Sequence, residues 1–90
     1  MLNRLYIGSN DKTKRLEYDK AIRITAKQFE GFTAFKGDGY WQGKKEKCVI
    51  IEIESENKNK VLSLIKNLAK DLNQSAIGLV KIGKMDFIGA

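Results

Sequence analysis

The sequence predicts an α+β domain in which a four-stranded antiparallel sheet carries two helices on one face. The prediction rests first on the apolar residues, whose spacing along the chain switches between strand-like alternation and helical periodicity in the order β-α-β-β-α-β. It rests second on length, because 90 residues with 42% hydrophobic content suffice for one modest core. We therefore expect a single domain over residues 1–90.

The first half of the chain predicts a strand, a helix and a second strand. At 2–7, Leu5 and Ile7 alternate with Arg4 and Tyr6, as in a half-buried strand that ends at Gly8. Helical spacing continues over 14–30, where Gly31 is a plausible terminator, and its apolar stripe contains Tyr18, Ile22, Ala26 and Phe29, flanked by Ala21 and Thr25. A second strand is expected over 32–42, broken or bent at 37–39, with a hairpin turn at 43–46.

The second half predicts a strand, a helix and a final strand. Over 47–54, Val49, Ile51 and Ile53 share one face. The helix over 58–72 has Asn57 or Ser55 as N-cap, Asn73 at its end, and apolar residues at one-sided spacing: Val61, Leu64, Ile65, Leu68 and Leu72. The last strand is expected over 76–82, followed by a short apolar tail through Met85, Phe87 and Ile88.

Two β-α-β halves joined by a hairpin form the ferredoxin-like arrangement, which leaves one face of the sheet without helices. We therefore expect the open face to carry one set of residues from 32–41 together with Arg4, Tyr6, Cys48, Ile50, Glu52 and Glu54. In each strand, the residues that alternate with this set are expected to occupy the core between the sheet and the helices.

The composition excludes several chemistries. The chain has no histidine and one cysteine, Cys48, so it cannot build a histidine-based triad, a Cys/His zinc site, a Cys-ligated iron–sulfur cluster or an internal disulfide framework. Cys48 is most simply a small apolar side chain in the sheet. No cofactor is expected, and function must rest on shape, lysines, carboxylates, aromatics and backbone groups.

The net charge of +6 favours anionic partners or simply solubility. Fourteen of the 17 basic residues are lysines, which are less suited than arginine to bidentate recognition of phosphate or guanine. Because the basic residues are interleaved with acids, they also fit a solvated surface. No apolar run approaches a membrane span and no signal-peptide segment follows Met1, so we expect a cytoplasmic protein with no membrane partner.

The segment 32–47 concentrates glycines, lysines and aromatic residues. Backbone N–H groups of a glycine-rich turn beside lysines bind phosphates or other anions, and an aromatic ring can stack a nucleobase. The candidate ligand-binding residues are Tyr6, Lys36, Tyr40, Trp41, Lys44 and Lys45, with Lys47 close by. The alternative is a long bent hairpin with one aromatic residue in the core.

Two further groups of charged residues each allow two interpretations. Lys12, Lys14 and Arg15 at the expected start of the first helix oppose the helix dipole, which indicates either a nearby anion or simple exposure. Glu52, Glu54 and Glu56 are either a carboxylate cluster or solubilising strand residues. A small enzyme would have to use Glu52, Asp86 or a lysine, and unchanged activity in Glu52→Gln and Asp86→Asn variants would exclude it.

The string Leu5-Tyr6-Ile7-Gly8-Ser9-Asn10 resembles the first-strand motif of RNA-recognition-motif domains. The resemblance implies that Tyr6 stacks a base. The third expected strand departs from that family, because Lys47–Glu54 contains no aromatic residue and ends in carboxylates. An RNA- or nucleotide-binding module would show salt-sensitive binding that weakens on Tyr6→Ala or Trp41→Ala.

A second resemblance covers most of the chain. Gly31-Phe32-Thr33, together with Gly37, Gly39 and Trp41, is similar to the pattern of a family of small uncharacterised ferredoxin-like proteins from bacteria and phages. The lysine-rich, proline-free composition is similar to that of phage accessory proteins. The resemblance implies a non-enzymatic inhibitor of host defence, which binds a nuclease complex or sequesters a nucleotide signal.

The first functional hypothesis is therefore a small non-catalytic binding protein. It would form homo-oligomers through the open sheet face or an edge strand, and its partner would be an anionic ligand or a host protein. The alternatives are the RNA- or nucleotide-binding module and the small enzyme.

Overall fold

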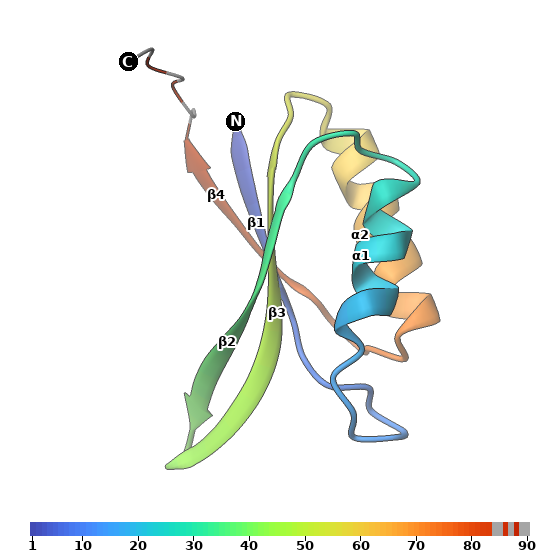
Figure 1. Cartoon of the computed structure of the whole chain (residues 1–90), viewed down its shortest axis with the longest axis vertical. Coiled ribbons are helices and arrows are strands. Elements are labelled where there is room, and N and C mark those ends of the chain that lie inside the picture. The colour runs from blue at the N-terminus through green and yellow to red at the C-terminus, as the bar shows by residue number, and fades with distance from the viewer. Residues whose placement is uncertain (84–85, 87, 89–90) are drawn as a thin grey trace.

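The computed structural model describes residues 1–83, 86 and 88, and for Trp41 it describes the backbone but not the side chain. Along this part of the chain the elements are β1 (Leu2–Ile7), α1 (Tyr18–Ala26), β2 (Thr33–Trp41), β3 (Lys44–Glu54), α2 (Lys58–Asp71) and β4 (Gly78–Gly83). The strands form one antiparallel sheet in the order β2-β3-β1-β4, and both helices cover one face of it (Figure 1). The predicted ferredoxin-like α+β fold is confirmed.

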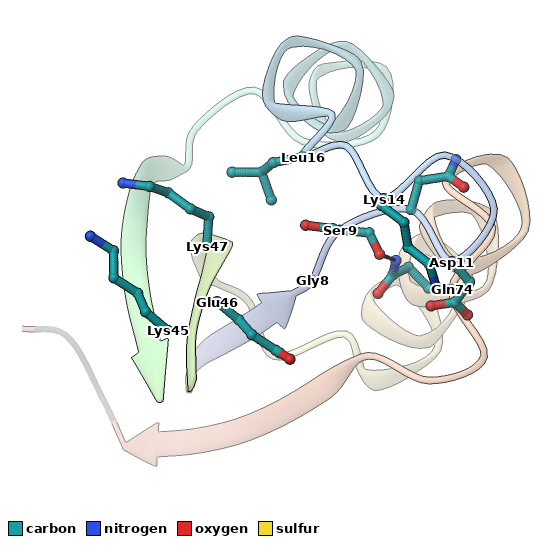
Figure 2. A pocket seen from close by; sticks show the side chains of 10 residues that line it. Gly8, Ser9, Asp11, Lys14, Leu16, Lys45, Glu46, Lys47 and Gln74 are labelled. Atoms are coloured by element: carbon teal, nitrogen blue, oxygen red, sulfur yellow. Dashed lines mark hydrogen bonds between the residues drawn. The ribbon is translucent and has the colours of Figure 1, made fainter. Parts of the chain in front are cut away.

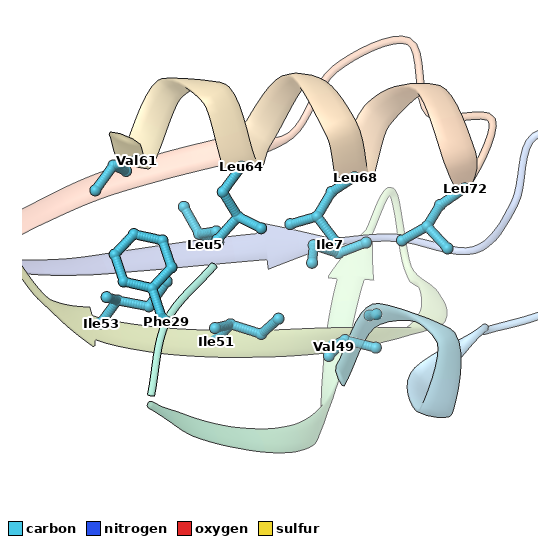
Figure 3. Packing of buried hydrophobic residues seen from close by; sticks show 11 residues of the cluster. Leu5, Ile7, Phe29, Val49, Ile51, Ile53, Val61, Leu64, Leu68 and Leu72 are labelled. Carbon is cyan, nitrogen blue, oxygen red and sulfur yellow. The ribbon is translucent and has the colours of Figure 1, made fainter. Parts of the chain in front are cut away.

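The core lies between the helix layer and the two central strands, β1 and β3. Leu64 and Leu68 are fully buried and point from α2 toward Leu5 and Ile7 of β1, with Ile51 of β3 in the same layer (Figure 3). Helical spacing puts the apolar residues of α2 on one side, and strand alternation does the same for β1 and β3. The predicted stripe of α2 is correct, with Val61 and Leu72 buried and Ile65 packed at its margin.

Helix α1 is shorter than predicted. Residues 14–17 precede it, and Lys14 has a φ of 62°, a conformation that cannot continue into an α-helix. The buried stripe contains Ala21, Thr25 and Phe29, whereas the predicted member Ala26 is exposed. Thr25 is accommodated because its hydroxyl donates to the carbonyl of Ala21 over 2.9 Å. Thr25, whose hydroxyl has a hydrogen-bond partner in the same helix, thus occupies the core position that the hydropathy pattern predicts for Ala26.

The hairpin between β2 and β3 is longer and tighter than predicted. Trp41 pairs with Lys44, so the turn consists of Gln42 and Gly43, and not of 43–46. Both turn residues have positive φ, 50° and 78°, as a two-residue type I′ turn requires. β2 also continues without a break through 37–39.

Gly37 serves the packing of the sheet rather than a bend. A Cβ atom at Gly37 would lie 2.9 Å from Ile50 Cδ1 and 3.4 Å from Cys48 Sγ, so these two side chains occupy the space above it. The paired strands run beyond the helices as a two-stranded extension, residues 37–48, which we call the hairpin arm (Figure 1).

The remaining boundaries differ slightly from prediction. β3 begins at Lys44 because it pairs along the whole arm, and β4 spans Gly78–Gly83 instead of 76–82. Asn57 is the N-cap of α2, and Asn73 follows the helix with a φ of 51°. Of the expected apolar tail, Met85 and Phe87 lie outside the described residues, and Ile88 is exposed. Within the described part of the chain, no helix has the length and apolar character needed to cross a bilayer.

The N-cap makes a first testable prediction. Asn57 Oδ1 accepts from the Lys60 N–H over 3.0 Å, so Asn57→Ala should lower the free energy of unfolding by about 1 kcal/mol. Asn67→Ala, in the exposed middle of the same helix, removes an exposed 3.4 Å hydrogen bond to Gln28 and gains helix propensity, so its effect should stay within about 0.5 kcal/mol. Urea denaturation followed by circular dichroism measures both. Equal losses in the two variants would contradict the assigned cap.

Candidate functional site

The loop between β1 and α1 is organised by one buried side chain, Asn10, which is 3% exposed. Its Oδ1 accepts from the N–H groups of Lys12 and Thr13 over 2.8 and 3.1 Å, and its Nδ2 donates to Glu17 over 2.5 Å. The Asn10 carbonyl also accepts from the Lys14 N–H over 2.8 Å. An Asn side chain that hydrogen-bonds to nearby backbone N–H groups in this way stabilises a compact turn.

The same loop is attached to the chain that leaves α2. The Asp11 N–H donates to the Asn73 carbonyl over 3.1 Å, and the Ser75 N–H donates to Asp11 Oδ2 over 3.1 Å. The Gln74 amide donates to the Ser9 carbonyl. The two loops therefore form one hydrogen-bonded wall at the end of the sheet where β1 ends.

A cavity of about 560 Å³ lies between this wall and the hairpin arm (Figure 2). Its volume is within the range of small-molecule sites, about 300–1,000 Å³. We call it the loop–arm cavity. It is lined by Gly8, Ser9, Asn10, Asp11, Lys14, Leu16, Lys45, Glu46, Lys47 and Gln74.

The lysines of the hairpin arm at the loop–arm cavity form only weak ion pairs. The ammonium groups of Lys45 and Lys47 turn toward Asp38 of β2, at 3.8 and 3.2 Å, and all three side chains are substantially exposed. Exposed pairs of this kind contribute about 0–1 kcal/mol. One carboxylate is thus shared by two lysines, and either lysine can rotate toward an anion at little cost.

The six predicted ligand-binding residues do not form one site. Alternation along β2 and β3 puts Lys36, Tyr40 and Lys45 on the helix-side face, and Lys44 on the other face. Of the six, Lys45 lines the loop–arm cavity. Lys36 lies over the Tyr18 ring, 5.1 Å from its centroid, and Tyr40 is 71% exposed.

Tyr6 lies on the open face, and Trp41 is placed only by its backbone pairing with Lys44.

The sequence reasoning missed most of the cavity wall. Lys47 was grouped with the arm lysines, and its spacing of two residues from Lys45 correctly puts both on one face. Lys14 was assigned to a helix start, whereas it belongs to the Asn10 loop. Nothing in the local pattern indicated that Gln74, 65 residues from its partner Ser9, would close the wall.

The open face of the sheet carries a second group of polar residues. Arg4 donates from Nε and Nη2 to Glu52 Oε2 over 2.7 and 2.5 Å, and from Nη1 to the Tyr6 hydroxyl over 3.5 Å. The hydrogen bonds to Tyr6 and Glu52 raise the pKa of Arg4 further above its usual range. Arg4 and Glu52 neutralise each other on this face.

The proposed carboxylate cluster is not assembled for metal binding. Glu52 is engaged by Arg4, while Glu54 and Glu56 contact the amino group of Met1. Within the described residues, no three Cys, Asp or Glu side chains gather closely enough to hold a metal ion. Asp86 is exposed, and Cys48 is half-buried beside Gly37.

Comparison with known proteins identifies relatives by structure alone, since no protein-family model and no curated protein sequence matches the chain. A phage SAM lyase in its apo state superposes with a TM-score of 0.68 at 21% identity, covering 87% of this chain and 75% of that one. The periplasmic divalent cation tolerance protein CutA from Archaeoglobus fulgidus gives a TM-score of 0.46 at 18% identity, covering 94% and 87%. At 21% identity the likeness to the phage SAM lyase shows a shared fold and no more.

Proposed function

We propose that this chain is a small non-catalytic binding protein whose ligand is a nucleotide carrying phosphate groups, held in the loop–arm cavity. The observation that carries the proposal is that Lys45 and Lys47 both line this cavity and share one exposed ion-pair partner, Asp38. Lysines paired this weakly gain more from a phosphate than they lose from their present partner.

The opposite wall suits a polar ligand of defined shape. The Asn10 loop is already ordered by five hydrogen bonds through Asn10, so little conformational freedom is lost when a ligand binds to it. Leu16 offers apolar surface, while Gln74 and Ser9 offer polar groups. A nucleotide combines these requirements, because it has an apolar base, a polar sugar and an anionic tail.

The biological role that we propose is sequestration of a nucleotide signal by a phage-encoded counter-defence protein in the host cytoplasm. The likeness to a phage SAM lyase supports a phage setting. In this role the protein acts as a homo-oligomer, and the alternative partner is a host protein complex.

Binding is tested with the intact chain. ATP and a cyclic dinucleotide are added in thermal-shift and calorimetric titrations at 50 and 200 mM salt, and at least one should raise the melting temperature, less so at the higher salt. The double variant Lys45→Ala/Lys47→Ala should weaken binding at least tenfold. Lys44→Ala is the matched control, because it removes a lysine of the same strand from the opposite face. Equal losses in both variants, or no binding by either nucleotide, would refute the proposed site.

A second candidate function, cleavage of S-adenosylmethionine, is favoured by the name of the structural neighbour. Incubation of the protein with S-adenosylmethionine, followed by mass spectrometry, separates the two candidates. We expect the compound to persist. Its consumption by the wild-type chain at enzyme-like rates would replace the binding function with a catalytic one.

A further inference from the structure

The uncovered face of the sheet has an unusual composition at its centre. Two rows of paired positions cross all four strands there: Phe35, Ile50, Tyr6 and Gly78 in one, and Thr33, Glu52, Arg4 and Val80 in the other. We call these eight positions the open-face centre. Tyr6, Phe35 and Val80 remain 38, 41 and 46% exposed. Large apolar side chains gathered at neighbouring positions mark an interaction surface more strongly than scattered ones do.

The charges of the open-face centre point to the kind of partner. The chain has 14 lysines, yet none occupies these eight positions, and the single cation, Arg4, is already paired with Glu52. Nucleic acids require cations that are free to meet phosphates. This surface therefore fits a protein partner better than RNA, although Tyr6 occupies the strand position from which a base would be stacked.

A second copy of this chain matches the surface well. Two molecules that each carry a net charge of +6 repel each other, and the open-face centre adds nothing to that repulsion because its one cation and one anion balance. It is also self-complementary, because it holds one cation and one anion side by side. In a face-to-face contact, Arg4 of one copy can approach Glu52 of another while the apolar side chains lose contact with water.

The two edges of the sheet are less suited to self-association. β2 has Lys36, Asp38 and two glycines along its length, and β4 has Lys81 between glycines at both ends. Charged residues and glycines are the usual means by which edge strands avoid pairing with other chains.

We propose that copies of this chain associate with one another face to face through the open-face centre, and not by edge-strand pairing. The inference rests on the homo-oligomer of the proposed function and specifies its surface. Its tests measure the mass of the assembly and not ligand binding. A failure to bind nucleotides would therefore leave the proposed self-association intact, and a monomeric protein would leave the proposed nucleotide site intact.

The first test is size-exclusion chromatography with light scattering across a range of protein concentrations. The wild-type chain should have at least twice the 10.2 kDa mass of one copy, and Val80→Lys should return it to a single copy. Leu62→Lys is the matched control, because Leu62 is 47% exposed on α2, in the helix layer, and should leave the mass unchanged. A wild-type monomer at every concentration overturns the proposal, as does an oligomer that survives Val80→Lys.

The second test uses the charge pair. Arg4→Glu leaves two carboxylates at the centre of the face and Glu52→Arg leaves two cations, so each variant alone should be monomeric. An equimolar mixture should form hetero-oligomers, because the two altered faces are then complementary. Circular dichroism establishes that both variants are folded. If folded variants fail to associate when mixed, or if each still self-associates, the face-to-face contact is wrong. If the wild type is monomeric, and if it binds an RNA oligonucleotide with an affinity that falls in Tyr6→Ala, the open-face centre is an RNA-binding surface and not a self-association surface.

Discussion

Replacing Leu64 by alanine should lower the free energy of unfolding by about 2–5 kcal/mol, because it removes buried methyl groups and leaves a cavity. Leu64 is fully buried between α2 and the sheet (Figure 3). In a domain of this size the loss corresponds to roughly 4–8 °C in melting temperature for each kcal/mol. The change thus removes a large part of the total stability, which is about 5–15 kcal/mol for typical domains.

The control for this prediction is two residues away. Leu62 belongs to the same helix and is 47% exposed, so Leu62→Ala makes the same chemical change with the same helix propensity but leaves no cavity. Its cost should stay below about 1 kcal/mol. Both variants are compared in urea at one fixed protein concentration, since self-association would add to the apparent stability. Similar losses would mean that α2 does not pack on the sheet through this stripe.

Replacing Asn10 by alanine should damage the loop–arm cavity more than any other single change in its wall. Three hydrogen bonds of the Asn10 side chain disappear, and the N–H groups of Lys12 and Thr13 lose their acceptor. We expect a loss of about 1–3 kcal/mol in unfolding free energy, and a loss of nucleotide affinity of at least tenfold because the loop is no longer ordered before binding.

Thr13→Ala serves as the comparison within the same loop. The Thr13 hydroxyl accepts only from the exposed Arg15 N–H, over 3.3 Å, so its removal should change both quantities little. Proteolysis of the folded protein provides a third measurement, because a loosened loop is cut faster. If Asn10→Ala is as stable and as protease-resistant as Thr13→Ala, the ordering role assigned to Asn10 is wrong.

The two surfaces described above are spatially distinct. The loop–arm cavity is lined by Lys45, Glu46 and Lys47 of the arm and by the loops at the end of β1, whereas the open-face centre lies on the side of the sheet that the helices leave uncovered. Since Lys45 and Lys47 face one way and Tyr6 and Ile50 the other, ligand binding and self-association can be altered by separate substitutions.

Elements with strong periodicity could be predicted closely from the sequence. α2 begins where predicted and ends within one residue, because its leucines repeat at helical spacing and Asn57 caps it. The bounds of β1, Leu2–Ile7, follow from the sequence for the same kind of reason, because apolar and polar side chains alternate over 2–7. α1 could not be delimited in this way, because its start depends on Asn10 and Lys14, whose turn is held by contacts that hydropathy does not reveal.

Three features could be predicted from the amino-acid sequence alone: the fold class, the absence of histidine chemistry, and the alternation that separates Lys45 from Lys44. These features follow from composition and from local periodicity, which act over a few residues. The tertiary structure brings Lys45 and Lys47 to the same cavity as the Asn10 loop and Gln74, and it aligns Phe35, Ile50 and Tyr6 across three strands. Strand register and loop docking bring together residues far apart in the chain, and no local pattern encodes which of them meet.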